Sequence, residues 1–139
     1  MFEGKVLAVD LDATLCEYDH WVSVEHFGRV LKANVDMLRT LKDMGVRILI
    51  HTCRMNGQWP GENYERSYEL LKKWLDDNEV PYDKICTQKD GKPFAHAYFG
   101  DNYVGIEPNK DSYILADAAF REICRVMGRY DDKGVPASG

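Results

Sequence analysis

The stretch that decides the fold is VLAVDLDAT, residues Val6 to Thr14. Its apolar half runs directly into two aspartates, Asp10 and Asp12, which are spaced two residues apart. A short apolar run without polar alternation is typical of a strand that is covered on both faces. An unpaired charge at the end of such a strand is costly. The pattern therefore predicts a buried strand over residues 5–9 whose carboxylates need a cationic partner.

Segments typical of strands alternate with segments typical of helices along the rest of the chain. That order predicts a three-layer, Rossmann-like α/β domain with a mostly parallel central sheet. We expect one domain over residues 1–128 and a flexible polar tail over 129–139. Residues 15–26 are mixed and aromatic, which predicts an ordered loop or a small hairpin. The other elements expected are strands at 46–51, 84–87 and 97–99, and helices at about 27–44, 62–78 and 112–127.

The composition narrows the partners that the protein can have. The net charge is −5 with no basic run, which argues against a dedicated nucleic-acid binder. No apolar stretch approaches membrane-spanning length, and the N-terminal MFEGK lacks the layout of a signal peptide. The four widely spaced cysteines fit reduced thiols better than disulfides or a zinc site, so we expect a cytoplasmic protein. The apolar stripe of the last helix leaves two interpretations open, docking on its own domain or on a second subunit of a homo-oligomer.

Polar residues stand at or near the end of each expected strand. Ligands of parallel α/β sheets bind just beyond the carboxyl ends of the strands, so these side chains are expected to converge on one edge. The candidates are Asp10 and Asp12 after the first strand, Thr52 and Arg54 after the second, Lys92 in the loop before the last strand and Asp101 after it.

Four motifs in this order resemble those of the haloacid dehalogenase (HAD) superfamily of phosphotransferases. The resemblance covers roughly residues 5–104 and implies a capless phosphatase that hydrolyses phosphomonoesters through an aspartyl-phosphate. The motifs are DLDAT with Asp10 and Asp12, HTCR with Thr52, GKPFA with Lys92 and YFGDN with Asp101.

The resemblance also implies a role for each of these residues. Asp10 is the nucleophile, and Asp12 is the general acid for the leaving oxygen and then the base for water. Mg²⁺ is held by Asp10, by the backbone carbonyl of Asp12 and by Asp101, because a hard cation prefers oxygen ligands. Thr52 and Lys92 hold the phosphoryl oxygens, where charge collects in the transition state.

The segment after the first motif resembles the mobile flap of the family. This makes His20 and Trp21 candidate substrate contacts, together with Arg54. The intervals 15–51 and 53–91 leave no room for a cap domain. The site is therefore expected either to be open, which permits a large phosphorylated substrate, or to be closed by a neighbouring subunit that restricts it to a small phosphate ester. The acidic balance favours a small phosphorylated metabolite, either a sugar phosphate or a nucleotide, over a nucleic acid.

Two residues depart from the pattern of the family. Ala13 stands where Gly is common, and Gly100 stands where many capless members have a second acid. The second departure makes the metal ligands less certain, with Asn102 and Asp111 as substitutes. It also motivates an alternative function, a HAD-like protein that binds phosphate or metal with weak or no turnover.

Each candidate residue also has an interpretation without catalysis. Asp10 and Asp12 could cap a turn or a helix. A response-regulator-like domain also places acids, Thr and Lys around Mg²⁺, but its acid pair and its phospho-acceptor lie on separate strands. The remaining candidates could cap the backbone (Thr52), be solvated (Lys92), form a turn (Asp101) or cover surface and pack (Arg54, His20, Trp21).

Overall fold

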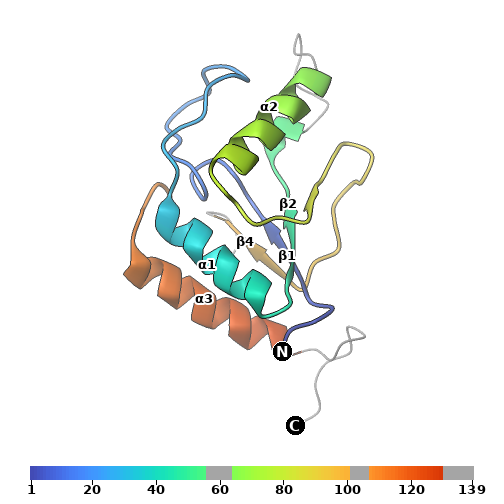
Figure 1. Ribbon diagram of the computed structural model, residues 1–139, viewed down its shortest axis with the longest axis vertical. Helices are drawn as coiled ribbons and strands as arrows, with labels where there is room; N and C mark the ends of the chain where they lie inside the picture. The colour runs from blue at the N-terminus through green and yellow to red at the C-terminus, as the bar shows by residue number, and fades with distance from the viewer. Residues whose placement is uncertain (56–63, 101–106, 130–139) are drawn as a thin grey trace.

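The computed structural model describes residues 1–55, 64–100 and 107–129. Its elements in chain order are β1 (Val6–Val9), α1 (Lys32–Asp43), β2 (Arg47–Ile50), the 3₁₀ helix η1 (Cys53–Met55), α2 (Tyr64–Asp77), β3 (Lys84–Ile85), β4 (Ala97–Phe99) and α3 (Tyr113–Met127). The strands form one all-parallel sheet in the order β3-β2-β1-β4, and helices flank it (Figure 1). The predicted Rossmann-like α/β fold with a parallel central sheet is confirmed.

The central strand β1 pairs with β2 on one side and with β4 on the other. The register aligns Val9 with Ile50 and with Phe99, so the three strands end level with one another. Backbone hydrogen bonds continue past these ends, from the Asp10 amide to the Phe99 carbonyl (2.9 Å) and from the His51 amide to the Val9 carbonyl (2.8 Å). The residues that follow the strands therefore emerge side by side at the carboxyl edge of the sheet.

The core forms where alternate strand residues meet the apolar stripes of the helices. Leu7, Ile48 and Phe99 are fully buried there, in one cluster with residues of α1, α2 and α3. Helix α3 packs against α1 and β4 (Figure 1). The stripe of this last helix thus docks on its own domain, through Ala116, Ala119, Ile123 and Met127.

The other face of the sheet carries Tyr98 and Leu49 and lies against residues 87–96. The Tyr98 hydroxyl donates to the Pro93 carbonyl at 2.8 Å. A hollow of about 230 Å³ lies beside this segment, with Leu49, Lys84 and Phe94 among its lining residues. Residues 87–96 carry Lys92, so this packing decides where that side chain lies.

Residues 27–31 are not helical, which corrects the expected start of the first helix near residue 27. They run back along residues 15–17, with hydrogen bonds from the Glu17 amide to the Arg29 carbonyl (2.9 Å) and from the Leu31 amide to the Leu15 carbonyl (2.7 Å). Gly28 permits this approach, since a Cβ there would lie 1.9 Å from the Glu17 carbonyl oxygen. Residues 15–31 thus form a folded-back segment, here called the flap.

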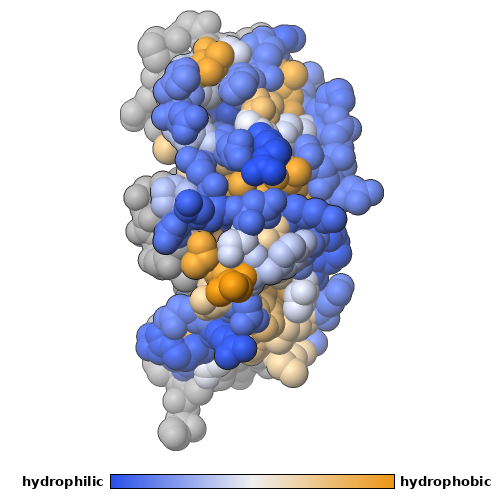
Figure 2. Space-filling view, turned by 90° about the vertical axis from the view of Figure 1, so that its left-hand side faces the viewer, coloured by the Kyte–Doolittle hydropathy of each residue, from blue (hydrophilic) through white to orange (hydrophobic). Residues whose placement is uncertain are grey.

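The face of the molecule shown in Figure 2 is mostly hydrophilic in its upper part, whereas apolar residues gather in its lower half. Tyr113, the first residue of α3, is 60% exposed, and its hydroxyl donates to Asp36 at 2.6 Å. No helix within the described ranges is long and apolar enough to cross a membrane. The predicted tail lies outside the described residues beyond Arg129.

Candidate functional site

The carboxyl edge of the sheet brings together three of the residues predicted to act there. Asp10 directly follows β1, between the ends of β2 and β4, and its carboxylate accepts a hydrogen bond from the Leu11 amide at 2.8 Å. Thr52 is buried one residue beyond the hydrogen-bonded end of β2. Its hydroxyl accepts from the Arg54 amide at 3.2 Å, which leaves its own proton for another acceptor.

Asp12, the third of these residues, forms a two-pronged ion pair with Arg54. The Nε and Nη2 atoms of Arg54 each donate to one carboxylate oxygen of Asp12, at 2.9 Å. The Arg54 side chain is 6% exposed and that of Asp12 19%. A planar guanidinium matches a carboxylate in this geometry, and the two hydrogen bonds fix the orientation of both side chains.

Aromatic rings and a carbonyl enclose the rest of the Arg54 guanidinium. Its central carbon lies 4.2 Å from the ring centre of Phe27 and 5.2 Å from that of Trp21. Nη2 also donates to the His26 carbonyl at 2.9 Å, while the buried Nη1 has no hydrogen-bond partner among the described residues. Arg54 therefore joins the flap to the first motif.

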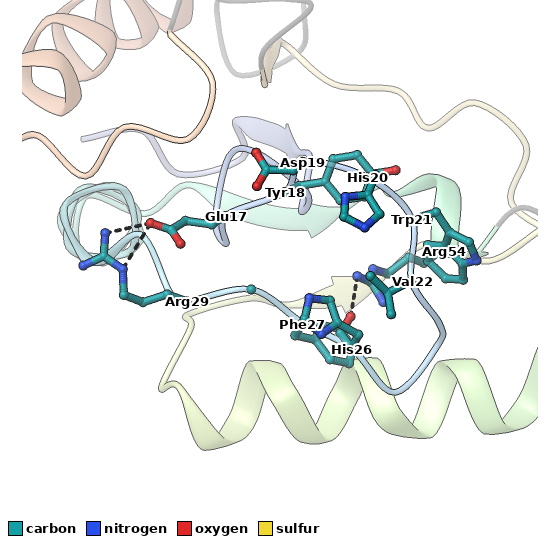
Figure 3. A pocket seen from close by; sticks show the side chains of 11 residues that line it. Glu17, Tyr18, Asp19, His20, Trp21, Val22, His26, Phe27, Arg29 and Arg54 are labelled. Carbon is teal, nitrogen blue, oxygen red and sulfur yellow. Dashed lines mark hydrogen bonds and ion pairs between the residues drawn. The ribbon is translucent and has the colours of Figure 1, made fainter.

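A pocket of about 320 Å³ opens between the two arms of the flap (Figure 3). It contains all three residues predicted as substrate contacts, His20, Trp21 and Arg54. A salt bridge at 2.8 Å joins Glu17 to Arg29 at one end. The hairpin-like return of the flap creates this pocket, and Arg54 connects it to Asp12.

Lys92 lies near Tyr98 and His51. Its ammonium is 5.4 Å from the ring centre of Tyr98, and it makes no ion pair with the described residues. The pKa of His51 is lowered, mainly because the imidazole is partly buried and also because the positive charge of Lys92 lies nearby. The predicted contact between Lys92 and a phosphate stays a prediction.

The fourth motif residue, Asp101, lies outside the described residues, so its position relative to Asp10 is not described. No group of three metal-binding side chains occurs within the described ranges. The carbonyl oxygen of Asp12 accepts no hydrogen bond from the described residues, whereas those of Leu11 and Ala13 do. Together with the Asp10 carboxylate, that oxygen fits the ligand preference of Mg²⁺.

Two residues that support this site were not predicted in that role. The Asn109 side chain accepts from the Tyr18 amide (2.7 Å) and donates to the Tyr18 carbonyl (2.8 Å), which fixes the first arm of the flap. Asp111, considered above as a metal ligand, instead accepts from the Ala33 amide at 2.8 Å and caps α1. Both contacts cross about 80 or 90 residues of sequence, and no local pattern signals such a pairing.

The thiol of Cys16, close to Asp12, is expected to be unreactive. Cys16 is fully buried, and its Sγ lies 3.6 Å from an Asp12 oxygen. Burial, and then the negative charge of Asp12, raise its pKa to about 12. The thiol therefore stays protonated at neutral pH and behaves as a small apolar side chain.

Comparison with known proteins supports the fold alone. No family model matches the chain, and no curated protein does. A crystal structure of a structural-genomics target from Vibrio cholerae is similar, with a TM-score of 0.52 and 22% sequence identity. The match covers 86% of this chain and 98% of that one.

Proposed function

We propose that the protein is a Mg²⁺-dependent phosphomonoesterase of the HAD type that acts on a small phosphorylated metabolite in the cytoplasm. The observation that carries this proposal is the position of Asp10, Asp12 and Thr52 at one edge of a parallel sheet. In such sheets this edge is where ligands bind. The resemblance of the four motifs to HAD enzymes supplies the reaction.

In the proposed reaction, a carboxylate oxygen of Asp10 attacks phosphorus and the bond to the leaving oxygen breaks. The leaving oxygen takes up a proton, for which Asp12 is the proposed donor. Water then attacks the acyl phosphate, Asp12 accepts its proton, and inorganic phosphate leaves with the Asp10 carboxylate restored. Arg54 donates one hydrogen bond to each oxygen of Asp12, so proton transfer through Asp12 would use a lone pair that Arg54 leaves free.

The other proposed contacts stabilise charge. The Thr52 hydroxyl and the Lys92 ammonium hold the phosphoryl oxygens. Mg²⁺, held by Asp10, the Asp12 carbonyl and Asp101, supplies positive charge that offsets the repulsion between carboxylates and phosphate.

The test is hydrolysis of p-nitrophenyl phosphate with and without Mg²⁺. The Asp10→Asn variant is expected to lose at least about 10³-fold in kcat, as for loss of a nucleophile. Asp43→Asn, an exposed aspartate at the end of α1, is the matched control and keeps full activity. Full turnover by Asp10→Asn would overturn the assignment of the nucleophile.

A second function, binding of phosphate or metal without turnover, is favoured by two contacts. Arg54 occupies both oxygens of the proposed proton donor, and Lys92 lies against Tyr98. This alternative predicts that Mg²⁺ binds in a calorimetric titration while a broad panel of phosphate esters releases no phosphate.

A further inference from the structure

We propose that the flap pocket binds the leaving group of the phosphate ester, and that this group is a small, uncharged polyol, as in a monophosphorylated sugar. The inference rests on the proposed function, which places phosphoryl transfer at Asp10. It selects one of the two substrate classes that the sequence leaves open, the sugar phosphate over the nucleotide.

The pocket is connected to the proposed reaction through one side chain. Arg54 lines the pocket and binds both carboxylate oxygens of Asp12. The pocket is thus next to the first motif, with the Arg54 side chain between the two. The volume of about 320 Å³ is at the lower end of the usual range for ligand pockets, which favours a small group.

Phe27, one of the aromatic rings of the pocket, already contacts two other side chains, which argues against a nucleobase stacked on it. One face of Phe27 lies against the Arg54 guanidinium, 4.2 Å from its central carbon. Phe27 also stacks on Trp74, with 5.5 Å between ring centres and 13° between planes. Trp21 likewise has Arg54 against its ring. A base binds proteins largely by stacking on such rings, and Phe27 has no face left for it.

The charges of the pocket argue against a second anionic group on the substrate. Both cations that line it are paired, Arg54 with Asp12 and Arg29 with Glu17. Asp19 adds a carboxylate that forms no ion pair with the described residues. A second phosphate would thus meet surplus negative charge and no unpaired cation among the described lining residues.

The remaining polar groups suit hydroxyls. The imidazoles of His20 and His26 make no hydrogen bond to the described residues. Figure 3 shows the His20 ring directed into the space between the two arms of the flap. A neutral imidazole offers one donor and one acceptor, which is what neighbouring hydroxyl groups on a sugar can satisfy.

Calorimetric binding tests this inference without requiring turnover. The pairs compared are ribose 5-phosphate with adenosine 5′-monophosphate, and fructose 6-phosphate with fructose 1,6-bisphosphate. We expect the sugar monophosphate of each pair to bind wild-type protein at least about tenfold more tightly, as for a pocket matched to one group. Equal or tighter binding of the nucleotide or the bisphosphate would overturn the inference, as would no binding of any of the four.

His20→Ala separates the pocket from the phosphate site. It is expected to weaken binding of both sugar monophosphates by about three- to tenfold, the effect of one lost hydrogen bond, and to leave inorganic phosphate unaffected. Asp43→Asn is again the control and should change neither affinity. Equal weakening of sugar phosphate and inorganic phosphate by His20→Ala would contradict a role in binding the leaving group.

The same compounds, assayed for release of phosphate, distinguish the two proposals. Turnover that needs Asp10 but shows no preference between the pairs would overturn this inference and leave the proposed function standing. Selective binding of the sugar monophosphates without turnover would overturn the proposed hydrolysis and leave the preference of the pocket standing.

Discussion

Arg54 and Asp12 are 42 residues apart in the sequence and share two hydrogen bonds of 2.9 Å, one to each carboxylate oxygen. The pair fixes the short helix η1 against the first motif and closes the inner side of the flap pocket. Because both side chains are largely buried, either charge left alone would be costly. This ion pair thus stabilises the fold and also involves Asp12, the proposed proton donor.

Replacing Arg54 by Met is expected to lower the free energy of unfolding by about 3 kcal/mol. The substitution keeps an apolar stem against Phe27 but leaves the Asp12 carboxylate without its partner, a loss typical of breaking a buried pair. Urea unfolding followed by circular dichroism measures it. The control is Arg29→Met, which breaks the exposed pair with Glu17 and should cost less than about 1 kcal/mol. Similar losses in both variants would show that burial of the Asp12 pair has no special effect.

The substitution Asn109→Gly is expected to increase the mobility of the flap while keeping the backbone conformation at residue 109. Asn109 has φ of 61°, which Gly adopts readily, and the change removes both hydrogen bonds to Tyr18. The expected cost is about 1–3 kcal/mol, with faster hydrogen exchange at the Tyr18 amide. Glu79→Gly is the matched control: Glu79 has φ of 54°, and its side chain makes no hydrogen bond to the described residues. Unchanged exchange at Tyr18 would mean that other contacts hold the flap.

The sequence predicted the parallel sheet and its functional edge because the relevant signals are local. An apolar strand that ends in Asp10 and Asp12 sits in the middle of the sheet, and the other strand segments fell within a few residues of their expected bounds. The joint position of Asp10 and Thr52 followed from topology alone, since parallel strands end at one edge.

Features that depend on long-range contacts were not predicted. The helical apolar spacing continued through residues 27–31, but pairing with residues 15–17 overrides it there, helped by Gly28. The position of Lys92 against Tyr98 depends on how residues 87–96 pack on the sheet. The bond between Arg54 and Asp12 is of the same kind, since nothing in either local sequence identifies the partner.

Asp90 makes the turn after β3 sensitive to acid. Its carboxylate accepts from the Lys84 ammonium (2.7 Å) and from the Thr87 amide (2.7 Å). The hydrogen bond from Lys84, and then that from Thr87, lower its pKa to about 2, below about 3.9 for an unperturbed Asp. A lowered pKa means that the fold favours the ionised form. The Asp90 carboxylate therefore adds to the free energy of unfolding above a pH of about 4, and this contribution is lost as the pH falls towards about 2.

Asp90→Asn is expected to remove this contribution selectively. Wild type should be more stable than the variant in urea unfolding at pH 6, and the difference should shrink as the pH is lowered through about 4 to 2. Asp117→Asn, which breaks an exposed i,i+4 pair with Arg121, is the matched control for the loss of an exposed aspartate. A difference for Asp90→Asn that stays constant down to pH 2 would contradict the role of ionisation.

Ala13 adopts φ of 69°, a left-handed conformation that a residue with a Cβ rarely takes, and it is 6% exposed. Gly adopts this conformation without strain. Ala13→Gly should change the free energy of unfolding by no more than about 1 kcal/mol, because relief of the backbone strain offsets the lost methyl and the greater freedom of the unfolded chain. Ala13→Val should cost at least about 2 kcal/mol, since a β-branched side chain tolerates this conformation poorly. The control is the exposed Ala118→Val in α3, where only helix propensity changes and about 0.5 kcal/mol is expected. If Val cost no more at position 13 than at 118 in urea unfolding, the left-handed conformation of the DLDAT turn would be wrong.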